Sequence, residues 1–291
     1  MKKIVIAGFG KPVLDLINIF KDKFDIKGVI LDYERPKKSP SFYKKLEMLS
    51  ISILSIDNIN QKNIDAIIVV NYNKIIDVNS IKCSLVLNIH MGILPMYRGN
   101  GANSWSLLNG DRNVGYTLHQ VSDVLDGGLI YYKFKYEIKE NETYFHAKTA
   151  INIDIKNNLP LVIDKILNGK IKGTNQDDEE FIYASKLKPE DGVLKHWNYT
   201  TQDILNRYMI FSKPLGTGLK MKYKNELLEI HKLSSIPKYK VSKGFSGAVV
   251  LKTNSGSVWI KTKDTAISID EIIVDNKIVK PSSLLKIGYR L

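Results

Sequence analysis

The chain has 291 residues, 44% hydrophobic and 25% charged, so it can bury a large and a smaller core and is not disordered overall. No apolar run reaches the length of a membrane span. The first residues, MKKIVIAGFG, lack a signal peptide's apolar core and cleavage site, so we expect a cytoplasmic protein without membrane association. The single cysteine, Cys83, excludes an internal disulfide and a multi-cysteine metal site.

The formal net charge of +13 is concentrated near the carboxyl terminus. Residues 195–291 hold 17 Lys and Arg against 7 Asp and Glu. A basic domain of this kind can bind a nucleic acid electrostatically. However, 15 of the 17 basic residues are lysines, and the whole chain favours Lys, Asn and Ile, which a general codon or habitat bias would also produce. Both interpretations stay open.

The amino-terminal stretch predicts the opening of a parallel α/β sheet. Residues 3–7 form a β-rich run, Gly8-Phe9-Gly10 forms a turn, and Pro12 opens an apolar-periodic helix that continues to Phe20. The glycine pair alone does not make a dinucleotide fingerprint, because the third glycine of that motif is missing.

Alternating apolar runs and amphipathic segments continue this α/β pattern. Apolar spacing predicts helices at 42–49, 103–109 and 149–167, and Pro160 should kink or split the last one. The expected strands are 26–31, a short run at 51–56, 66–70, 85–89, 115–121 and 131–138, the last at a sheet edge.

Beyond residue 190 the pattern changes to short β runs. We predict three parts: a catalytic domain at 1–190, a linker and helix at 191–213, and a β domain at 214–291. The helix is expected at 201–211. The β runs suggest a small barrel of the OB type, with strands at 217–223, 227–233, 247–252, 258–262 and 266–274.

The candidate chemistry lies at the end of strand 85–89. Alternation places Asn88 and His90 on one face of the strand and Ile89 on the other. The imidazole can take a proton from a nucleophile, and the amide can donate to a developing oxyanion. Asp126, in a later Asp-Gly-Gly turn, can hold the histidine's tautomer, so the set suits acyl transfer to an amine. His119 is either a neighbour of this set or a packing residue.

These residues also carry a family resemblance. N-I-H-x-x-x-L-P-x-x-R-G from Asn88, followed by L-D-G-G around Asp126, resembles the formyltransferases that use 10-formyltetrahydrofolate. That family includes methionyl-tRNA, glycinamide ribonucleotide and sugar N-formyltransferases. The linker Y-x-x-K-L-x-x-E-D-G from Tyr183 and the ending P-x-x-x-L-x-x-G-x-x-L from Pro281 are similar to the family's. The resemblance implies the formyltransferase fold: a Rossmann-like, mostly parallel sheet followed by an OB-like barrel.

The resemblance also implies roles for individual residues. It makes Asn88, His90 and Asp126 the catalytic trio, with 10-formyltetrahydrofolate as co-substrate. We expect no metal, because the five histidines are scattered and none repeats at ligand spacing with acids. It places folate-pocket candidates near the strand ends, at Tyr72, Asn73, Leu94, Val121 and Asp123. For the turn at Tyr72, a polar cap on a strand end is the other interpretation. Acceptor-binding candidates follow the dyad, at Arg98, Gly99, Asn100, Asn103 and Trp105. Arg98 can pair with a phosphate or carboxylate of the substrate, or pin its own loop to an acid such as Asp123.

Two acceptors compete. A nucleotide-linked amino sugar, used for a surface glycan such as lipopolysaccharide, fits the signature G-N-G-A-N-S-W after Arg98. It also fits loop 32–40, which lacks the glycine- and arginine-containing insertion of the tRNA branch. Initiator tRNA fits the basic C-terminal region. A non-catalytic folate- or nucleotide-binding module is a third interpretation. The barrel or an edge strand offers a surface for a homodimer.

Overall fold

The computed structural model describes residues 1–32, 40–60, 62–74, 76–83, 85–140, 142–176, 180–236, 241 and 243–291. These residues form two compact units. The first unit holds Met1–Asn103, Asn113–Glu137 and His146–Ser185, and the second holds Ser104–Arg112, Ile138–Phe145 and Lys186–Leu291. The boundaries expected at 190 and 213 stay predictions.

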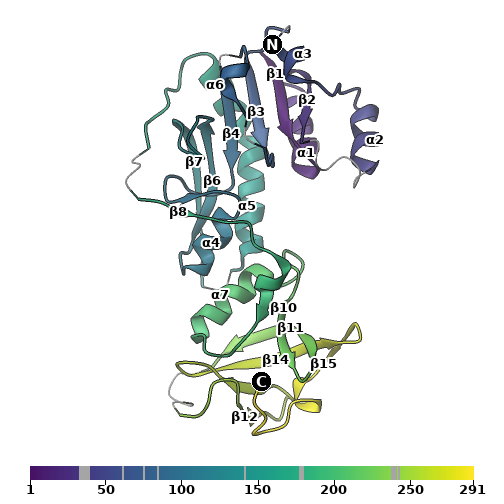
Figure 1. Cartoon of the computed structure of the whole chain (residues 1–291), viewed down its shortest axis with the longest axis vertical. Coiled ribbons are helices and arrows are strands. Elements are labelled where there is room, and N and C mark those ends of the chain that lie inside the picture. The colour runs from purple at the N-terminus through teal and green to yellow at the C-terminus, as the bar shows by residue number, and fades with distance from the viewer. Residues whose placement is uncertain are drawn as a thin grey trace. The chain divides into compact units, whose positions relative to one another are not determined.

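A six-stranded sheet organises the first unit, in the order β2-β1-β3-β4-β6-β7 (Figure 1). Strands β1 to β4 pair in parallel, whereas β6 pairs antiparallel with β4 and with the edge strand β7. The mixed α/β class with a mostly parallel sheet is therefore confirmed. The strands are β1 (Lys3–Gly8), β2 (Asp25–Leu31), β3 (Ala66–Val70), β4 (Val86–His90), β6 (Asn113–Gln120) and β7 (Ile130–Glu137).

The sheet has different cores on its two faces. Helices α1 (Lys11–Phe20), α5 (Tyr144–Asn157) and α6 (Leu159–Leu167) contribute to one core, which includes Leu87 and Ile89 of β4 (Figure 1). Val86 belongs to the other core, together with Ile59 of the short helix α3 (Ile56–Asn60). The alternation of β4 therefore directs Asn88 and His90 away from α1, α5 and α6.

Most expected elements of this unit are present, and one is not. Pro160 separates α5 from α6, as predicted, and α2 runs over Pro40–Met48. The strand expected at 51–56 is wrong: Ile53 makes only an isolated bridge to Val29, and Ile56 begins α3. The physical reason is a cap, because the Ser55 hydroxyl accepts the backbone N–H of Asn58 at 3.2 Å and so favours a helix.

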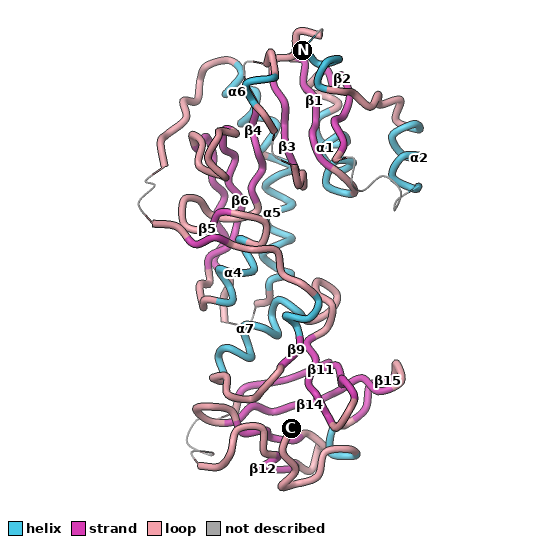
Figure 2. The backbone as a smooth tube through the Cα atoms, viewed as in Figure 1, coloured by secondary structure: helices cyan, strands magenta, loops and turns pink. Residues whose placement is uncertain are grey.

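Short elements follow the carboxyl end of β4. The chain there is loop apart from β5 (Tyr97–Arg98), before α4 (Ala102–Leu108) begins (Figure 2). Strand β5 pairs in parallel with β8 (Ile182–Tyr183), a strand that sequence patterning did not indicate. Residues 33–39, which form most of the loop that bears on the choice of acceptor, lie outside the described residues.

A seven-stranded sheet dominates the second unit, in the order β12-β13-β14-β11-β10-β9 with β15 beside β14. Helix α7 (Thr201–Phe211) begins with a capping box between Thr200 and Asp203. The expected β runs are all present, although in the described part of the chain the end strands β12 and β9 do not pair to close a barrel. The strands are β9 (Val193–Leu194), β10 (Leu219–Tyr223), β11 (Glu226–Ser235), β12 (Val249–Lys252), β13 (Val258–Lys261), β14 (Ala266–Val274) and β15 (Lys277–Val279).

The remaining regular elements that the structure describes are short 3₁₀ turns, at Val78–Ser80, Pro189–Gly192 and Pro281–Ser283. Among the described residues, no helix combines the length and the apolar character needed to cross a bilayer.

Candidate functional site

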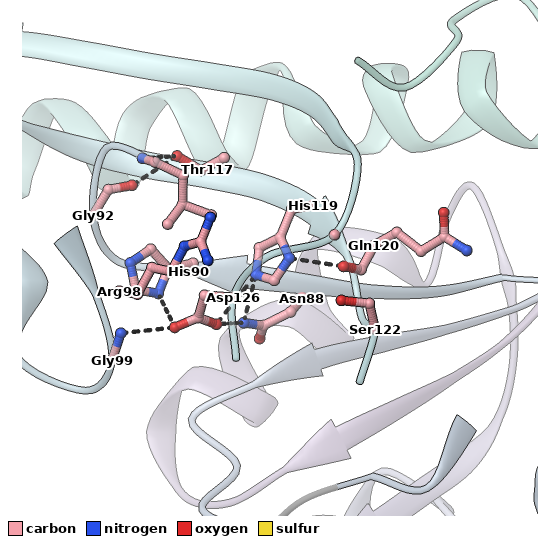
Figure 3. A network of polar contacts seen from close by, with 12 residues as sticks. Asn88, His90, Gly92, Arg98, Gly99, Thr117, His119, Gln120, Ser122 and Asp126 are labelled. Atoms are coloured by element: carbon pink, nitrogen blue, oxygen red, sulfur yellow. Dashed lines mark hydrogen bonds and ion pairs between the residues drawn. The ribbon is translucent and has the colours of Figure 1, made fainter. Parts of the chain in front are cut away.

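The predicted trio meets where β4 and β6 lie side by side. The antiparallel register places His119 opposite Asn88 and Thr117 opposite His90. Side chains opposite each other in such a pair are direct neighbours on one face of the sheet. Asp126 arrives from the loop after β6, and Figure 3 shows its carboxylate between the two imidazoles. The structure therefore brings Asn88, His90 and Asp126 together, as expected.

The backbone holds Asp126 in a tight turn. Its φ is 50°, a left-handed conformation that Asp tolerates better than most residues. A Cβ on Gly128 would lie 2.0 Å from the carbonyl oxygen of Gln120, so only glycine allows this close approach. The Gln176 side-chain amide donates to the carbonyl oxygens of Asp126 and Gly128, at 2.7 and 2.8 Å. These contacts fix where the carboxylate points.

Each oxygen of the Asp126 carboxylate serves a different imidazole. Oδ2 accepts the backbone N–H of Gly99 at 2.8 Å and lies 3.4 Å from His90 Nδ1. Oδ1 lies 3.3 Å from His119 Nε2 and 3.4 Å from Asn88 Nδ2. Burial by itself would raise the pKa of Asp126, but a hydrogen bond from His119, the positive charge of the two imidazoles when protonated, as they are at the acidic pH where this carboxyl titrates, and the Gly99 N–H lower it to about 2. The group is therefore a carboxylate near neutral pH.

His90 is a buried base with a defined tautomer. Its Nε2 lies 2.8 Å from the carbonyl oxygen of Tyr97, which can only accept, so Nε2 carries the hydrogen. Nδ1 then has the lone pair and faces Asp126. The Tyr97 carbonyl, and not Asp126, sets the tautomer. Burial lowers the pKa of His90 below its ordinary value of 6.5, while Asp126 and the Tyr97 carbonyl oppose that shift. The ring is neutral at neutral pH, and Asp126 stabilises the cation formed when Nδ1 takes a proton.

Asn88 points its amide nitrogen into this network. Nδ2 lies 3.1 Å from His119 Nε2 and 3.4 Å from Asp126 Oδ1. Figure 3 shows the amide oxygen directed away from both. In this orientation the amide hydrogens face protein groups, and the oxygen is the atom presented outward. The expected role as an oxyanion donor therefore requires the amide to turn.

Several site residues were not found from the sequence. Thr117 takes the Leu94 N–H at 3.1 Å and donates to the Gly92 carbonyl at 2.7 Å, so it shapes the loop after the dyad. Gln176 carried no recognisable signal, because it reaches Asp126 across 50 positions of the chain. The period-two spacing of Thr117 and His119 was a usable signal once the register with β4 was known.

The folate-pocket candidates lie in varied surroundings. Tyr72 and Val121 are partly buried against the core that contains Val86 of β4, so they lie on the same face of the sheet as the dyad. Leu94 is fully buried. Asn73 takes a 3.5 Å hydrogen bond from Asn100, and Asp123 is exposed. Their roles as folate ligands stay predictions.

The acceptor-binding candidates separate into two groups. Arg98 and Asn103 are only 1% and 3% exposed. Arg98 donates to Gln176 and lies 4.4 Å from the centre of the Phe181 ring, and Asn103 exchanges two hydrogen bonds with the Gly115 backbone. Both therefore have structural contacts in this conformation. Gly99 contacts Asp126 directly, and Asn100 is exposed. Trp105 lies on α4, half-buried.

Comparison with known proteins agrees with this geometry. Residues 51–163 match the family model described as "Formyl transferase". A methionyl-tRNA formyltransferase of Clostridium tetani is 25% identical over 95% of this chain and 93% of its own length.

Two solved structures share the fold over nearly the whole chain. WlaRD, a sugar 3N-formyltransferase solved with dTDP and 5-N-formyl-THF, has a TM-score of 0.70 at 24% identity and covers 95% of this chain and 99% of its own. An N-formyltransferase from Helicobacter canadensis, in complex with folinic acid and dTDP-3-aminofucose, has a TM-score of 0.69 at 19% identity, covering 92% and 98%. Together, these findings show that residues 51–163 match the formyl transferase family, that the chain shares the fold of these two solved N-formyltransferases, and that it is a formyl-transfer enzyme.

Proposed function

We propose that this enzyme moves a formyl group from 10-formyltetrahydrofolate to the amine of a nucleotide-linked amino sugar. The observation that carries the proposal is the Asp126 carboxylate bridging His90 and His119 beside Asn88, at the carboxyl end of β4. The carboxyl ends of parallel strands are where open α/β sheets bind ligands. A formamido sugar made here would be consumed by a glycosyl transfer reaction that builds a surface glycan.

The chain's own residues supply the proton chemistry. When bound, the folate supplies a formyl group on nitrogen. His90 Nδ1 takes the proton that the attacking amine loses as its bond to the formyl carbon forms, and Asp126 Oδ2 at 3.4 Å stabilises the resulting imidazolium. The Tyr97 carbonyl keeps the opposite nitrogen protonated throughout. Proton transfer by a positioned base contributes about 10²–10⁴ in rate.

The surroundings of the dyad fit a folate. Tyr72 and Val121 offer apolar surface on the face of the sheet that also presents Asn88 and His90. Gly92 allows the loop to pass close to the catalytic ring, because a Cβ there would lie 2.7 Å from His90 Nε2. An apolar wall with a few polar groups at one end is typical of a site for a flat aromatic ligand.

Exposed aromatic side chains support a nucleotide-linked acceptor. Phe181 and Tyr183 are 46% and 63% exposed, and Met96 is 47% exposed. A Cβ on Gly99 would lie 3.2 Å from the Tyr183 ring, so this ring is adjacent to the residue that binds Asp126. Aromatic faces of this kind stack on nucleobases. The full-length similarity of fold to the two dTDP-complexed sugar enzymes gives further support.

Initiator tRNA is the second candidate acceptor. The observation that favours it is the 25% identity to a methionyl-tRNA formyltransferase over 95% of this chain. The basic region 195–291 agrees with a polyanionic substrate.

One assay separates the candidates. The enzyme is incubated with 10-formyltetrahydrofolate and, in parallel, with dTDP- and UDP-linked 3- and 4-amino sugars or with methionine-charged initiator tRNA. Product formation is followed by mass spectrometry. We expect turnover on a nucleotide sugar alone; turnover on tRNA alone would overturn the choice.

A pair of histidine variants shows whether the proposed site is responsible. His90→Ala is expected to abolish turnover while folate binding persists. His231→Ala is the matched control, because the side chain of that histidine is 42% exposed and lies 4.0 Å from Glu271. Equal turnover in both variants would refute the site.

A further inference from the structure

His119 has a fixed tautomer of its own. It is 2% exposed and lies directly opposite Asn88 in the β4–β6 pair. Its Nδ1 lies 2.8 Å from the Gln120 carbonyl oxygen, so Nδ1 carries a hydrogen. In the neutral ring, Nε2 therefore has a lone pair and can only accept.

Three polar atoms meet at the inner end of Asn88. Asn88 Nδ2 lies 3.1 Å from His119 Nε2 and 3.4 Å from Asp126 Oδ1, and these two acceptors are 3.3 Å apart. With His119 neutral, the amide nitrogen is the donor of the three, and its two hydrogens suit the two acceptors. The amide oxygen is consequently held outward (Figure 3).

A proton on His119 reverses this preference. Nε2–H then donates to Asp126 Oδ1 and would oppose an N–H of Asn88. Turning the amide by half a rotation replaces that opposition with a hydrogen bond from Nε2 to the amide oxygen, and it directs the NH₂ group outward. In the first arrangement the two amide hydrogens serve two acceptors, and in the second the single Nε2–H is shared between Asp126 Oδ1 and the amide oxygen, so each acceptor faces a donor in both.

We propose that His119 is a positioning residue whose protonation decides which end of the Asn88 amide faces the reacting groups. The consequence for catalysis rests on the proposed formyl transfer. With His119 neutral, the outward oxygen accepts a hydrogen from the attacking amine. The proton lost by that amine passes from His90 Nδ1 to the Asp126 carboxylate at Oδ2, and then from that carboxyl group to His119 Nε2 beside Oδ1, which leaves His90 neutral and His119 charged. The outward NH₂ then donates to the formyl oxygen, where negative charge develops. Asn88 then serves both halves of the reaction.

The charged and titratable groups of this network lie close to His119. Asp126 is on its Nε2 side, the ring centre of His90 is 6.2 Å away, and Figure 3 shows Arg98 in the same network. In the described part of the chain, the Asn88 side chain contacts His119 and Asp126. A change of the Asn88 amide signal with pH therefore reports on the protonation of the groups in this network.

Nuclear magnetic resonance tests the coupling without any substrate. ¹⁵N-histidine labelling is expected to show His119 as the Nδ1–H tautomer when neutral and His90 as the Nε2–H tautomer. The Asn88 side-chain amide signal, assigned by its loss in Asn88→Ala, should shift with the same pH midpoint as the His119 ring nitrogens. A neutral His119 with its hydrogen on Nε2, or an Asn88 signal that ignores the His119 titration, would overturn the proposal.

Kinetics tests the consequence. His119→Gln keeps hydrogen-bonding capacity but cannot take a proton, and His119→Phe keeps a flat ring. Both are expected to lower kcat by about 10²-fold, the scale of one lost oxyanion donor, with KM nearly unchanged. In an Asn88→Ala background the same changes should cost no more than about twofold, because His119 acts through Asn88. Equal losses in both backgrounds would show a merely structural role.

The proposed function and the coupling between His119 and Asn88 can be refuted independently of each other. If no formyl transfer is detected but the Asn88 signal follows His119, the proposed function fails and the coupling stands. If transfer is detected and the signal does not follow His119, the coupling fails alone. The measurement on the unsubstituted protein also stays valid if either variant does not fold.

Discussion

Two carboxylates inside the first unit have similar burial and different partners. The Asp126 side chain is 10% exposed, and Asp154 on α5 is 6% exposed. Asp126 has nitrogen partners, including two imidazoles. Asp154 accepts from the hydroxyls of Tyr116, at 2.7 Å, and Tyr132, at 3.1 Å, and from the Asn158 amide. Both are satisfied, so satisfaction alone does not identify a reactive site.

The difference lies in whether the partners exchange protons near neutral pH. Burial and the Asp154 charge raise the pKa of Tyr132 to about 12, and burial and the same carboxylate raise the pKa of Tyr116 strongly. These hydroxyls keep their protons under physiological conditions. The imidazoles around Asp126 can gain or lose one. A buried carboxylate beside imidazoles can stabilise a proton that one of them takes up during catalysis. A buried carboxylate beside hydroxyl groups has the structural role of holding a helix against a sheet.

Replacing each carboxylate by an amide gives the largest predicted contrast. Asp126→Asn removes the charge that stabilises the His90 imidazolium, and we expect kcat to fall by about 10³-fold, within the range for general-base catalysis. Asp154→Asn should leave kcat within about twofold while costing about 1–3 kcal/mol of unfolding free energy, because a buried network loses a charged acceptor. Steady-state kinetics and urea unfolding of both variants measure this. A larger fall in kcat for Asp154→Asn than for Asp126→Asn would contradict the proposed difference between the two carboxylates.

The pH dependence sharpens the contrast. The base form of His90 is active and burial lowers its pKa, so kcat/KM should rise with pH along a limb whose midpoint lies below 6.5. Asp126 opposes that shift, so Asp126→Asn should move the midpoint still lower in whatever activity remains. Asp154→Asn should leave it unchanged. A limb above 6.5 in the unsubstituted enzyme would contradict the assignment of His90 as the base.

The free energy of unfolding should also depend on the ionisation of Asp126 at acidic pH. The pKa of Asp126 is about 2 in the folded chain against an ordinary 3.8, so ionised Asp126 contributes on the order of 2 kcal/mol above pH 3.8. That contribution is lost as the pH falls from 3.8 through about 2. Asp126→Asn should accordingly flatten the acid limb of a plot of unfolding free energy against pH.

The sequence predicted the site only where side-chain type and local spacing were sufficient. Alternation placed Asn88 and His90 on one face of a strand, and the Asp-Gly-Gly turn marked Asp126. The tautomer of His90 depends on the backbone carbonyl of Tyr97, which no residue type reveals. The contact of His119 with Asn88 depends on the register between two strands, which is a tertiary property.

For the fold, too, features set by local sequence were predicted and features set by other contacts were not. Apolar periodicity located nearly every helix and strand because burial follows it. The strand expected at 51–56 failed because one serine hydroxyl, on Ser55, starts a helix there. Strand β8 was missed because a strand of two residues is too short to show an alternating apolar pattern. Whether the second sheet closes into a barrel could not be predicted from the short β runs alone.

Adjacent residues of β6 offer a finer test, since Tyr116 faces Asp154 and Thr117 faces the site. Tyr116→Phe removes a hydrogen bond to a charged group and should cost about 1.5–3 kcal/mol of unfolding free energy, with kcat unchanged. Thr117→Val removes the contacts with Leu94 and Gly92 and should raise KM for the folate several-fold. Thr117→Ser, which keeps the hydroxyl, is the control. Loss of rate in Tyr116→Phe would show that the two networks are coupled.

Tyr132→Phe should have the smallest effect. Its hydroxyl shares Asp154 with Tyr116 but is only partly buried, at 3.1 and 3.2 Å from the two carboxylate oxygens. Water can replace it, so we expect a loss of about 0.5–1.5 kcal/mol, the net value of an ordinary hydrogen bond. Thermal unfolding of Tyr132→Phe, Tyr116→Phe and the double variant measures it. If the two losses add, each hydroxyl holds Asp154 independently; if the double variant loses more than their sum, each compensates for the other, as the shared carboxylate leads us to expect.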